Sequence, residues 1–390
     1  MRRRSELLLV ATAYAGFAAS GVPTGMLGVA WPSIGETFSL PLDALGLLLV
    51  TEMVGNLLIS FCGGSLISRI GVGRVLLLSV LARGLGALGY GLLPTWWLMV
   101  VMGVIAGAGG GALGVGLNTY FATKHSPAKM NWLHASYGLG AALGPALMRS
   151  VLGAGGSWRW SYVIAGLVLG LLAICFALTL DRWRLAARTS GGTPTSPIAR
   201  ASGLDTLKLP LAWAGIAIIF CFAGTEVTAG QWAYSLFTKA RSIDPDTAGA
   251  WVSAYWMGST VGRVFFGFIA TRFAVKQLLR VAMLGAICSA ALIWVNAVGL
   301  LSFLGLATLA FMLAPIFPLI TSTTPGRVGA EHGANAIGFQ VAAASLGATF
   351  LPSLAGVLAE RIGLEVIGPF LLVAAAVMFL LHEVVARSKT

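Results

Sequence analysis

The chain has 390 residues, of which 57% are hydrophobic and only 10% are charged. A soluble globular domain carries about 25% charged residues, so this composition, with a mean hydropathy of +0.89, excludes an ordinary soluble protein and indicates a polytopic membrane protein. The net charge of +12 does not indicate a nucleic-acid partner, because the basic residues lie mainly in short loops between apolar runs.

Apolar runs follow one another along the chain, and each is long enough to cross a bilayer core of about 30 Å as a helix. In chain order the expected spans are Leu7–Ile34, Ala44–Ser68, Val75–Leu93, Trp96–Thr123, Asn131–Val151, Trp160–Leu180, Leu209–Phe237, Ala248–Thr271, Gln277–Ala297, Leu300–Thr321, Gly333–Ala359 and Val366–Val385. The sequence therefore predicts an all-α membrane protein of twelve helices. A polar linker, 181–208, separates a six-helix bundle in 1–180 from another in 209–390.

Most of the 25 lysines and arginines lie at the N-terminus and in alternate loops, including the linker. Positive residues favour the cytoplasmic side, so both termini and the linker are expected there, in a multi-pass protein of the plasma (cytoplasmic) membrane. The four cysteines lie in separate apolar runs, and none forms a CxxC or Cys/His cluster. We therefore expect neither a metal site nor a cofactor.

The two halves repeat each other weakly. Gly64–Arg69 and Gly267–Arg272 share a pattern and lie 203 residues apart. The same offset matches two glycine pairs, Gly21 with Gly224 and Gly144 with Gly347. Parallel repeats of this kind occur in transporters built from two similar bundles.

The loop after the second span carries the first resemblance to a known family, through Gly64, Ser68, Arg69, Gly71, Gly73 and Arg74. It resembles the signature of the major facilitator superfamily, with Ser68 in place of the usual aspartate. A degenerate second copy contains Gly262, Arg263, Gly267 and Arg272. The resemblance implies the major facilitator fold and gating roles for Gly64, Ser68, Arg69, Arg74, Arg263 and Arg272.

Three stretches look like the fucose–galactose–glucose–proton symporter branch of that superfamily, including its bypass-of-stop-codon-type and sodium-dependent glucose transporter-like members. They are Asn131–Pro145, Gly224–Trp232 and Pro315–Pro318. The resemblance implies transport of a sugar or similar small polar solute, coupled to protons, with Na⁺ as the alternative ion. The sequence has no Walker loop for ATP, so a gradient is expected to drive transport.

Glu226 falls near the middle of the span Leu209–Phe237, where a carboxylate is costly unless it meets a partner, a cavity or a proton. We therefore expect Glu226 to couple transport or to bind solute. One to two turns further, Gln231 is suited to bonding sugar hydroxyls and Trp232 to stacking on a sugar ring. The alternatives are a Glu226 paired for packing and a Trp232 in the interfacial belt.

Glu52 is the rival coupling carboxylate, and Asn56 lies four residues on, on the same helix face. The alternative for Glu52 is an ion pair across the two halves. His134 and Tyr137 share a face at the start of the fifth span; His134 is a candidate proton relay or gating residue, and Tyr137 a candidate solute ligand.

Further polar candidates for solute binding are Asn118, Asn335 and Gln340, with a helix–helix hydrogen bond as the alternative for Asn118. Arg83 is expected to have a structural or gating partner, because a lone intramembrane arginine is expensive. Pro315 and Pro318 are expected to interrupt the tenth span, and Pro23 the first.

These patterns predict a secondary active transporter that acts as a monomer in the lipid bilayer. A multidrug or metabolite exporter of the same superfamily is the alternative within transport. A non-transporting sensor or an intramembrane enzyme is the alternative of another class, although no nucleophile–base pair or metal cluster supports an enzyme.

Overall fold

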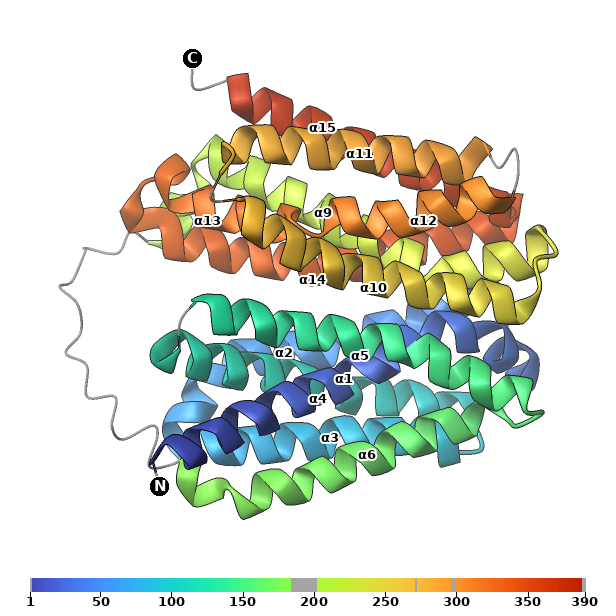
Figure 1. Cartoon of the computed structure of the whole chain (residues 1–390), viewed down its shortest axis with the longest axis horizontal. Coiled ribbons are helices and arrows are strands. Elements are labelled where there is room, and N and C mark those ends of the chain that lie inside the picture. Colours follow the sequence, from blue (N-terminus) through green and yellow to red (C-terminus); the bar gives the residue numbers. More distant parts are fainter. Residues whose placement is uncertain (1, 126, 184–201, 271, 296–298, 388–390) are drawn as a thin grey trace. The chain divides into compact units, whose positions relative to one another are not determined.

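Figure 1 shows the computed structural model of the chain, which describes residues 2–125, 127–183, 202–270, 272–295 and 299–387. The chain divides into two compact units, Met1–Gly192 and Thr193–Thr390. Most of the expected linker, residues 184–201, lies outside the description. The described residues form helices and no strand, which confirms the all-α prediction.

The first unit contains six long helices, namely α1 (Arg2–Phe38), α2 (Leu45–Ile70), α3 (Val72–Leu92), α4 (Trp96–Lys124), α5 (Pro127–Gly153) and α6 (Trp158–Leu178), with a short turn of helix, η1 (Leu42–Ala44), before α2. Their lengths follow from the apolar runs, which avoid strong helix breakers except at isolated prolines.

The second unit contains α8 (Gly203–Leu207), α9 (Pro210–Ser235), η2 (Leu236–Ala240), α10 (Pro245–Ile269), α11 (Val275–Val295), α12 (Gly299–Leu313), α13 (Ile316–Val328), α14 (Ala330–Ile362), η3 (Leu364–Val366) and α15 (Ile367–Arg387). The short α8 lies at the end of the expected linker. Within the described residues, ten helical stretches are long and apolar enough to cross a membrane; α5 and α10 are the expected spans outside that set.

The two units pack their helices in the same pairs. In the first unit α1 packs on α5, α2 on α4 and α3 on α6; in the second, α9 packs on α14, α10 on α12 and α11 on α15. A side chain at Gly55 would overlap the Val104 carbonyl, and one at Gly258 would overlap the Ala307 carbonyl. Each member of these contacts lies 203 residues from its counterpart, so the predicted repeat is also a repeat of helix packing.

The 203-residue offset does not extend to the first helix of each half. Gly144 on α5 packs against the Val22 carbonyl, and Gly347 on α14 packs against the Phe220 carbonyl. The two glycines are 203 residues apart, whereas Val22 and Phe220 are 198 apart. The match of Gly21 to Gly224 is therefore wrong as a structural equivalence, because α9 is shifted along α14.

Proline breaks one of the two spans in which a break was expected. The tenth span divides into α12 and α13 at Ala314–Pro315, as predicted, while Pro318 lies inside α13. The expected break at Pro23 is wrong, since α1 runs unbroken through it. One proline removes a single backbone hydrogen bond, which a long helix can tolerate. The neighbouring Gly25 packs against the Ala141 carbonyl, so α1 and α5 lie in close contact at this point.

Candidate functional site

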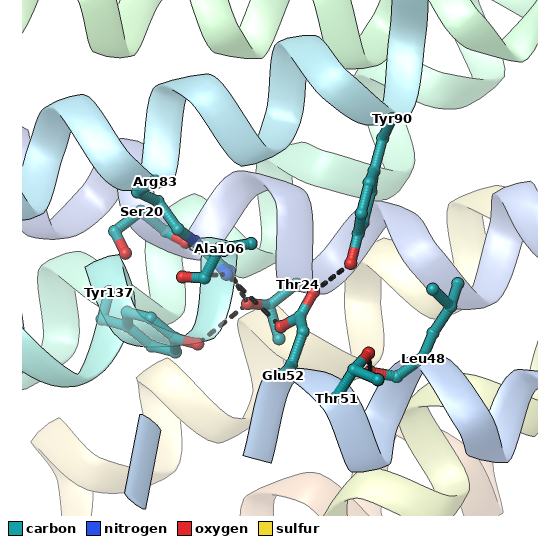
Figure 2. Close-up of polar contacts among 9 residues, drawn as sticks. All are labelled: Ser20, Thr24, Leu48, Thr51, Glu52, Arg83, Tyr90, Ala106 and Tyr137. Atoms are coloured by element: carbon teal, nitrogen blue, oxygen red, sulfur yellow. Dashed lines mark hydrogen bonds and ion pairs between the residues drawn. The ribbon is translucent and has the colours of Figure 1, made fainter. Parts of the chain in front are cut away.

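Glu52 of α2 and Arg83 of α3 form an ion pair inside the first unit (Figure 2). Arg83 Nη1 lies 3.3 Å from Glu52 Oε2, and the Tyr90 hydroxyl donates to Glu52 Oε1 over 3.1 Å. The Arg83 side chain is only 5% exposed, and that of Glu52 is 25% exposed. The alternative interpretation of Glu52, an ion pair across the halves, is therefore wrong: its partner lies in its own unit.

The Arg83 guanidinium also bonds two further helices, and a third is linked through Thr24. Its Nη2 donates to the Thr24 hydroxyl at 2.9 Å and the Ser20 carbonyl at 3.3 Å on α1, and its Nη1 donates to the Ala106 carbonyl of α4 at 3.3 Å. The Tyr137 hydroxyl of α5 donates to Thr24 over 3.0 Å, as Figure 2 shows. The expected partner of Arg83 is thus a network, which links α1 through α5.

Glu226 of α9 forms the corresponding network in the second unit. Its Oε1 accepts hydrogen bonds from Arg263 Nη2 at 3.2 Å and from the Ser259 hydroxyl at 3.1 Å, both on α10. The Tyr255 hydroxyl donates to the Glu226 backbone carbonyl over 2.6 Å. The Glu226 side chain is 12% exposed and that of Arg263 is 28% exposed. Glu226 is therefore a paired carboxylate, and Arg263 has its partner within its own half.

The two networks occupy matching places on the second helix of each half. Tyr255 and Ser259 of α10 lie 203 residues after Glu52 and Asn56 of α2. The charges are rearranged: the carboxylate is on the second helix of the first unit but on the first helix of the second unit. The sequence analysis missed Tyr90, Thr24, Tyr255 and Ser259, and the offset from Glu52 and Asn56 is the signal that could have found the last two.

Gln231 and Trp232 are buried in α9. The Trp232 side chain is fully buried, and its indole N–H donates to the Pro352 carbonyl of α14 over 2.8 Å. The interpretation of Trp232 as an interfacial belt residue is therefore wrong, because a belt residue lies at the protein surface. The indole presents no exposed ring face in this structure.

Asn335 and Gln340 of α14 have protein partners. The Asn335 amide donates to the Thr206 hydroxyl of α8 at 3.3 Å, and Thr206 also lies 2.9 Å from His332 Nδ1. The buried Gln340 amide donates to the Thr324 hydroxyl of α13 over 2.9 Å. These predicted solute ligands hold α8 and α13 against α14.

Asn118, His134 and Tyr137 lie on α4 and α5. Asn118 Oδ1 is buried and has no hydrogen-bond partner within the described part of the chain. His134 is exposed, and its ring edge meets Phe17 at a centroid distance of 5.7 Å, while the Tyr137 ring lies 5.1 Å from the same phenylalanine. Of the three residues, Tyr137 reaches the Glu52–Arg83 network, through Thr24.

The predicted gating loop joins α2 to α3 at Gly71, whose φ of +85° suits glycine. Arg69 and Arg74 flank it and are exposed, as is Arg272 beyond α10. The helical backbone of α2 includes Gly64 and Ser68, and the Ser68 side chain lies outside the description. The gating role of these residues stays a prediction.

A sequence model of the family described as Major Facilitator Superfamily matches residues 13–240 and 214–389, which together cover nearly the whole chain. The chain is 22% identical over 353 residues to the glucose/mannose transporter GlcP of Bacillus subtilis, a match that covers 88% of this chain and 86% of that protein. It is 24% identical over 173 residues to bypass of stop codon protein 6 of Saccharomyces cerevisiae, covering 42% of this chain and only 35% of the yeast protein.

Solved structures share the fold at low sequence identity. The outward conformation of the transporter FucP gives a TM-score of 0.65 at 17% identity, with 98% of this chain and 99% of that chain covered. The nucleoside transporter NupG gives a TM-score of 0.76 at 14% identity and covers 98% of each chain. At such identities the likeness concerns the fold alone.

Proposed function

Because the chain belongs to the Major Facilitator Superfamily and is therefore a multi-pass membrane transporter, we propose that it carries a sugar or similar small polar solute by alternating access, coupled to protons. The similarity to a glucose/mannose transporter along 88% of the chain supports the solute class. The proposal includes a monomer in the plasma membrane with both termini cytoplasmic, and Na⁺ as the alternative coupling ion.

The observation that carries the coupling proposal is the difference in burial between the two arginines. Protonating a carboxylate neutralises it and leaves its arginine without a counter-charge. Arg83 is almost fully enclosed within its unit, so losing the Glu52 charge would leave a buried cation without its counter-charge, whereas Arg263 is 28% exposed and less enclosed. We therefore assign coupling to Glu226 over Glu52.

We propose fewer residues in contact with solute than the sequence predicted. Asn118 Oδ1 is an acceptor without a protein partner among the described residues, which suits a solute hydroxyl. Tyr137 offers a hydroxyl that already bonds Thr24, and Glu226 offers a second carboxylate oxygen. Trp232, Asn335 and Gln340 bond neighbouring helices and are not part of these proposed contacts.

The test is uptake into vesicles that contain the purified full-length protein, with a panel of labelled hexoses and nucleosides. We expect one of these solutes to accumulate when the outside is made acidic, and a Na⁺ gradient at constant pH to have no effect. Accumulation driven by a Na⁺ gradient alone would instead identify Na⁺ as the coupling ion. Failure of every solute under both gradients, together with resistance to toxic compounds in cells that express the protein, would overturn the proposal in favour of the exporter.

A further inference from the structure

A second group of charged and polar side chains lies far along the second unit from Glu226. Residues of this group come from the start of α11, the last turn of α13 and the end of α15: Lys276, Arg280, Arg327, His382 and Glu383. Helix α11 packs on both α13 and α15. The same end of the unit, at the left in Figure 1, holds α13 and the end of α15. The positive-residue pattern predicts that this end faces the cytoplasm.

Glu383, the acidic member of this group, already forms an ion pair with Arg280. Arg280 Nε and Nη2 donate to its two carboxylate oxygens, each over 2.6 Å. This forked geometry uses the two oxygens of one carboxylate in parallel hydrogen bonds. Arg280 and Glu383 are therefore a paired arginine and carboxylate at the edge of this group.

Arg327 and His382 lack such a partner. Within the described residues Arg327, which is half-buried, makes no hydrogen bond or ion pair. The His382 side chain is 1% exposed, and neither of its ring nitrogens has a hydrogen-bond partner there. A buried polar group without a partner costs about 1–3 kcal/mol, so the two unpaired ring nitrogens of His382 indicate a missing partner.

The local field points to an anion as that partner. The charges of Arg327, Arg280 and Lys276 all act on the His382 ring, against the single opposing charge of Glu383. Basic pockets between transmembrane helices on the cytoplasmic side suit phosphate-bearing headgroups. An arginine fork and a ring N–H together can donate to two oxygens of one phosphate.

We propose that Arg327 and His382, with Lys276 and Arg280 at the rim, form a binding site for a phosphate group between α11, α13 and α15. The phosphate comes either from an anionic phospholipid headgroup or from free phosphate in solution. The site is independent of the solute site, since Glu226 and its partners lie on α9 and α10. Its occupation would hold the ends of three helices of the second unit together.

The experiment uses the purified full-length protein and two probes. Inorganic phosphate is titrated in neutral detergent at constant ionic strength, and retention of phosphatidylglycerol is measured by native mass spectrometry after extraction from mixed phosphatidylcholine–phosphatidylglycerol nanodiscs. We expect Arg327→Gln and His382→Gln each to weaken binding of the effective probe about tenfold, because each removes a donor to the phosphate. Glu383→Gln should tighten it, since the opposing charge is removed.

Arg182→Gln is the matched control, since Arg182 is an exposed arginine of the first unit that is also expected on the cytoplasmic side. It should leave binding unchanged. Retention of phosphatidylglycerol without phosphate binding identifies the lipid as the source, and phosphate binding in detergent identifies the free anion. If Arg327→Gln does not fold, the other two variants test the site: His382→Gln should weaken binding of the probe and Glu383→Gln should tighten it. Absence of binding to both probes, or equal losses in Arg182→Gln and the site variants, would overturn the site.

Discussion

The two halves of the chain have the same helix packing and different charge chemistry. In the first half the Glu52–Arg83 pair belongs to a hydrogen-bond network that links five helices, and the Arg83 side chain is only 5% exposed. In the second half the Glu226–Arg263 pair joins two helices, and Arg263 is 28% exposed. The repeat therefore preserves how the helices approach one another, while the polar side chains that they carry are free to differ.

This difference in burial concerns how much each arginine depends on its partner's charge. Breaking a buried pair by removing one charge is strongly destabilising, because the other charge stays desolvated. A less enclosed arginine loses less when its partner is neutralised, so the cost is expected to be smaller. The first network is thus suited to holding the bundle together, and the second is the one to which we assign the proposed coupling.

The largest effect is expected from Glu226→Gln, which keeps the side-chain shape and removes the exchangeable proton. Accumulation of solute against a gradient should be abolished, while counterflow exchange of labelled for unlabelled solute should continue, because exchange needs no net proton movement. Both are measured in vesicles with the solute identified by the uptake panel. Normal gradient-driven accumulation of solute by this variant would contradict the assignment of coupling to Glu226.

Glu52→Gln is the matched variant in the first half and should act on stability. It leaves the enclosed Arg83 charge without its counter-charge, so we expect a loss of about 3–5 kcal/mol in the free energy of unfolding. Glu226→Gln should cost less than Glu52→Gln, because Arg263 is less enclosed than Arg83. Denaturation in detergent micelles, followed by circular dichroism, measures both. Equal losses in the two variants would remove the distinction between the networks.

Most of the fold was predictable because the bilayer imposes a strong pattern on the sequence. Runs of about twenty apolar residues must be helices in lipid, so the all-helical fold and the repeat were visible before the structure. The unbroken α1 was not predictable from Pro23, since whether a proline breaks a helix depends on its neighbours. Here Gly25 fits against the Ala141 carbonyl of α5, a contact between residues far apart in the sequence.

The candidate site was predictable only in part. The expense of intramembrane charge correctly indicated that Arg83 needs a partner. It could not indicate which acid that partner was, because pairing depends on the rotation of each helix about its axis. For the same reason the sequence did not indicate that the amides of Asn335 and Gln340 bond Thr206 and Thr324, and their roles as solute ligands stay predictions. Polar residues in a membrane serve packing and binding with the same chemistry, and spacing alone does not separate the two.

Trp232→Phe is expected to have the smallest effect, and it sharpens the comparison by testing a residue of α9 that lies outside the polar network. The change removes the indole N–H bond to the Pro352 carbonyl but keeps an aromatic ring in the buried space. We expect a loss of about 1 kcal/mol in the free energy of unfolding, the usual net worth of one hydrogen bond. The concentration of solute that half-saturates uptake should not change, because the buried ring does not touch solute in this proposal. A severalfold rise in that concentration with unaltered stability would instead return Trp232 to the solute site and extend the functional part of α9 beyond Glu226.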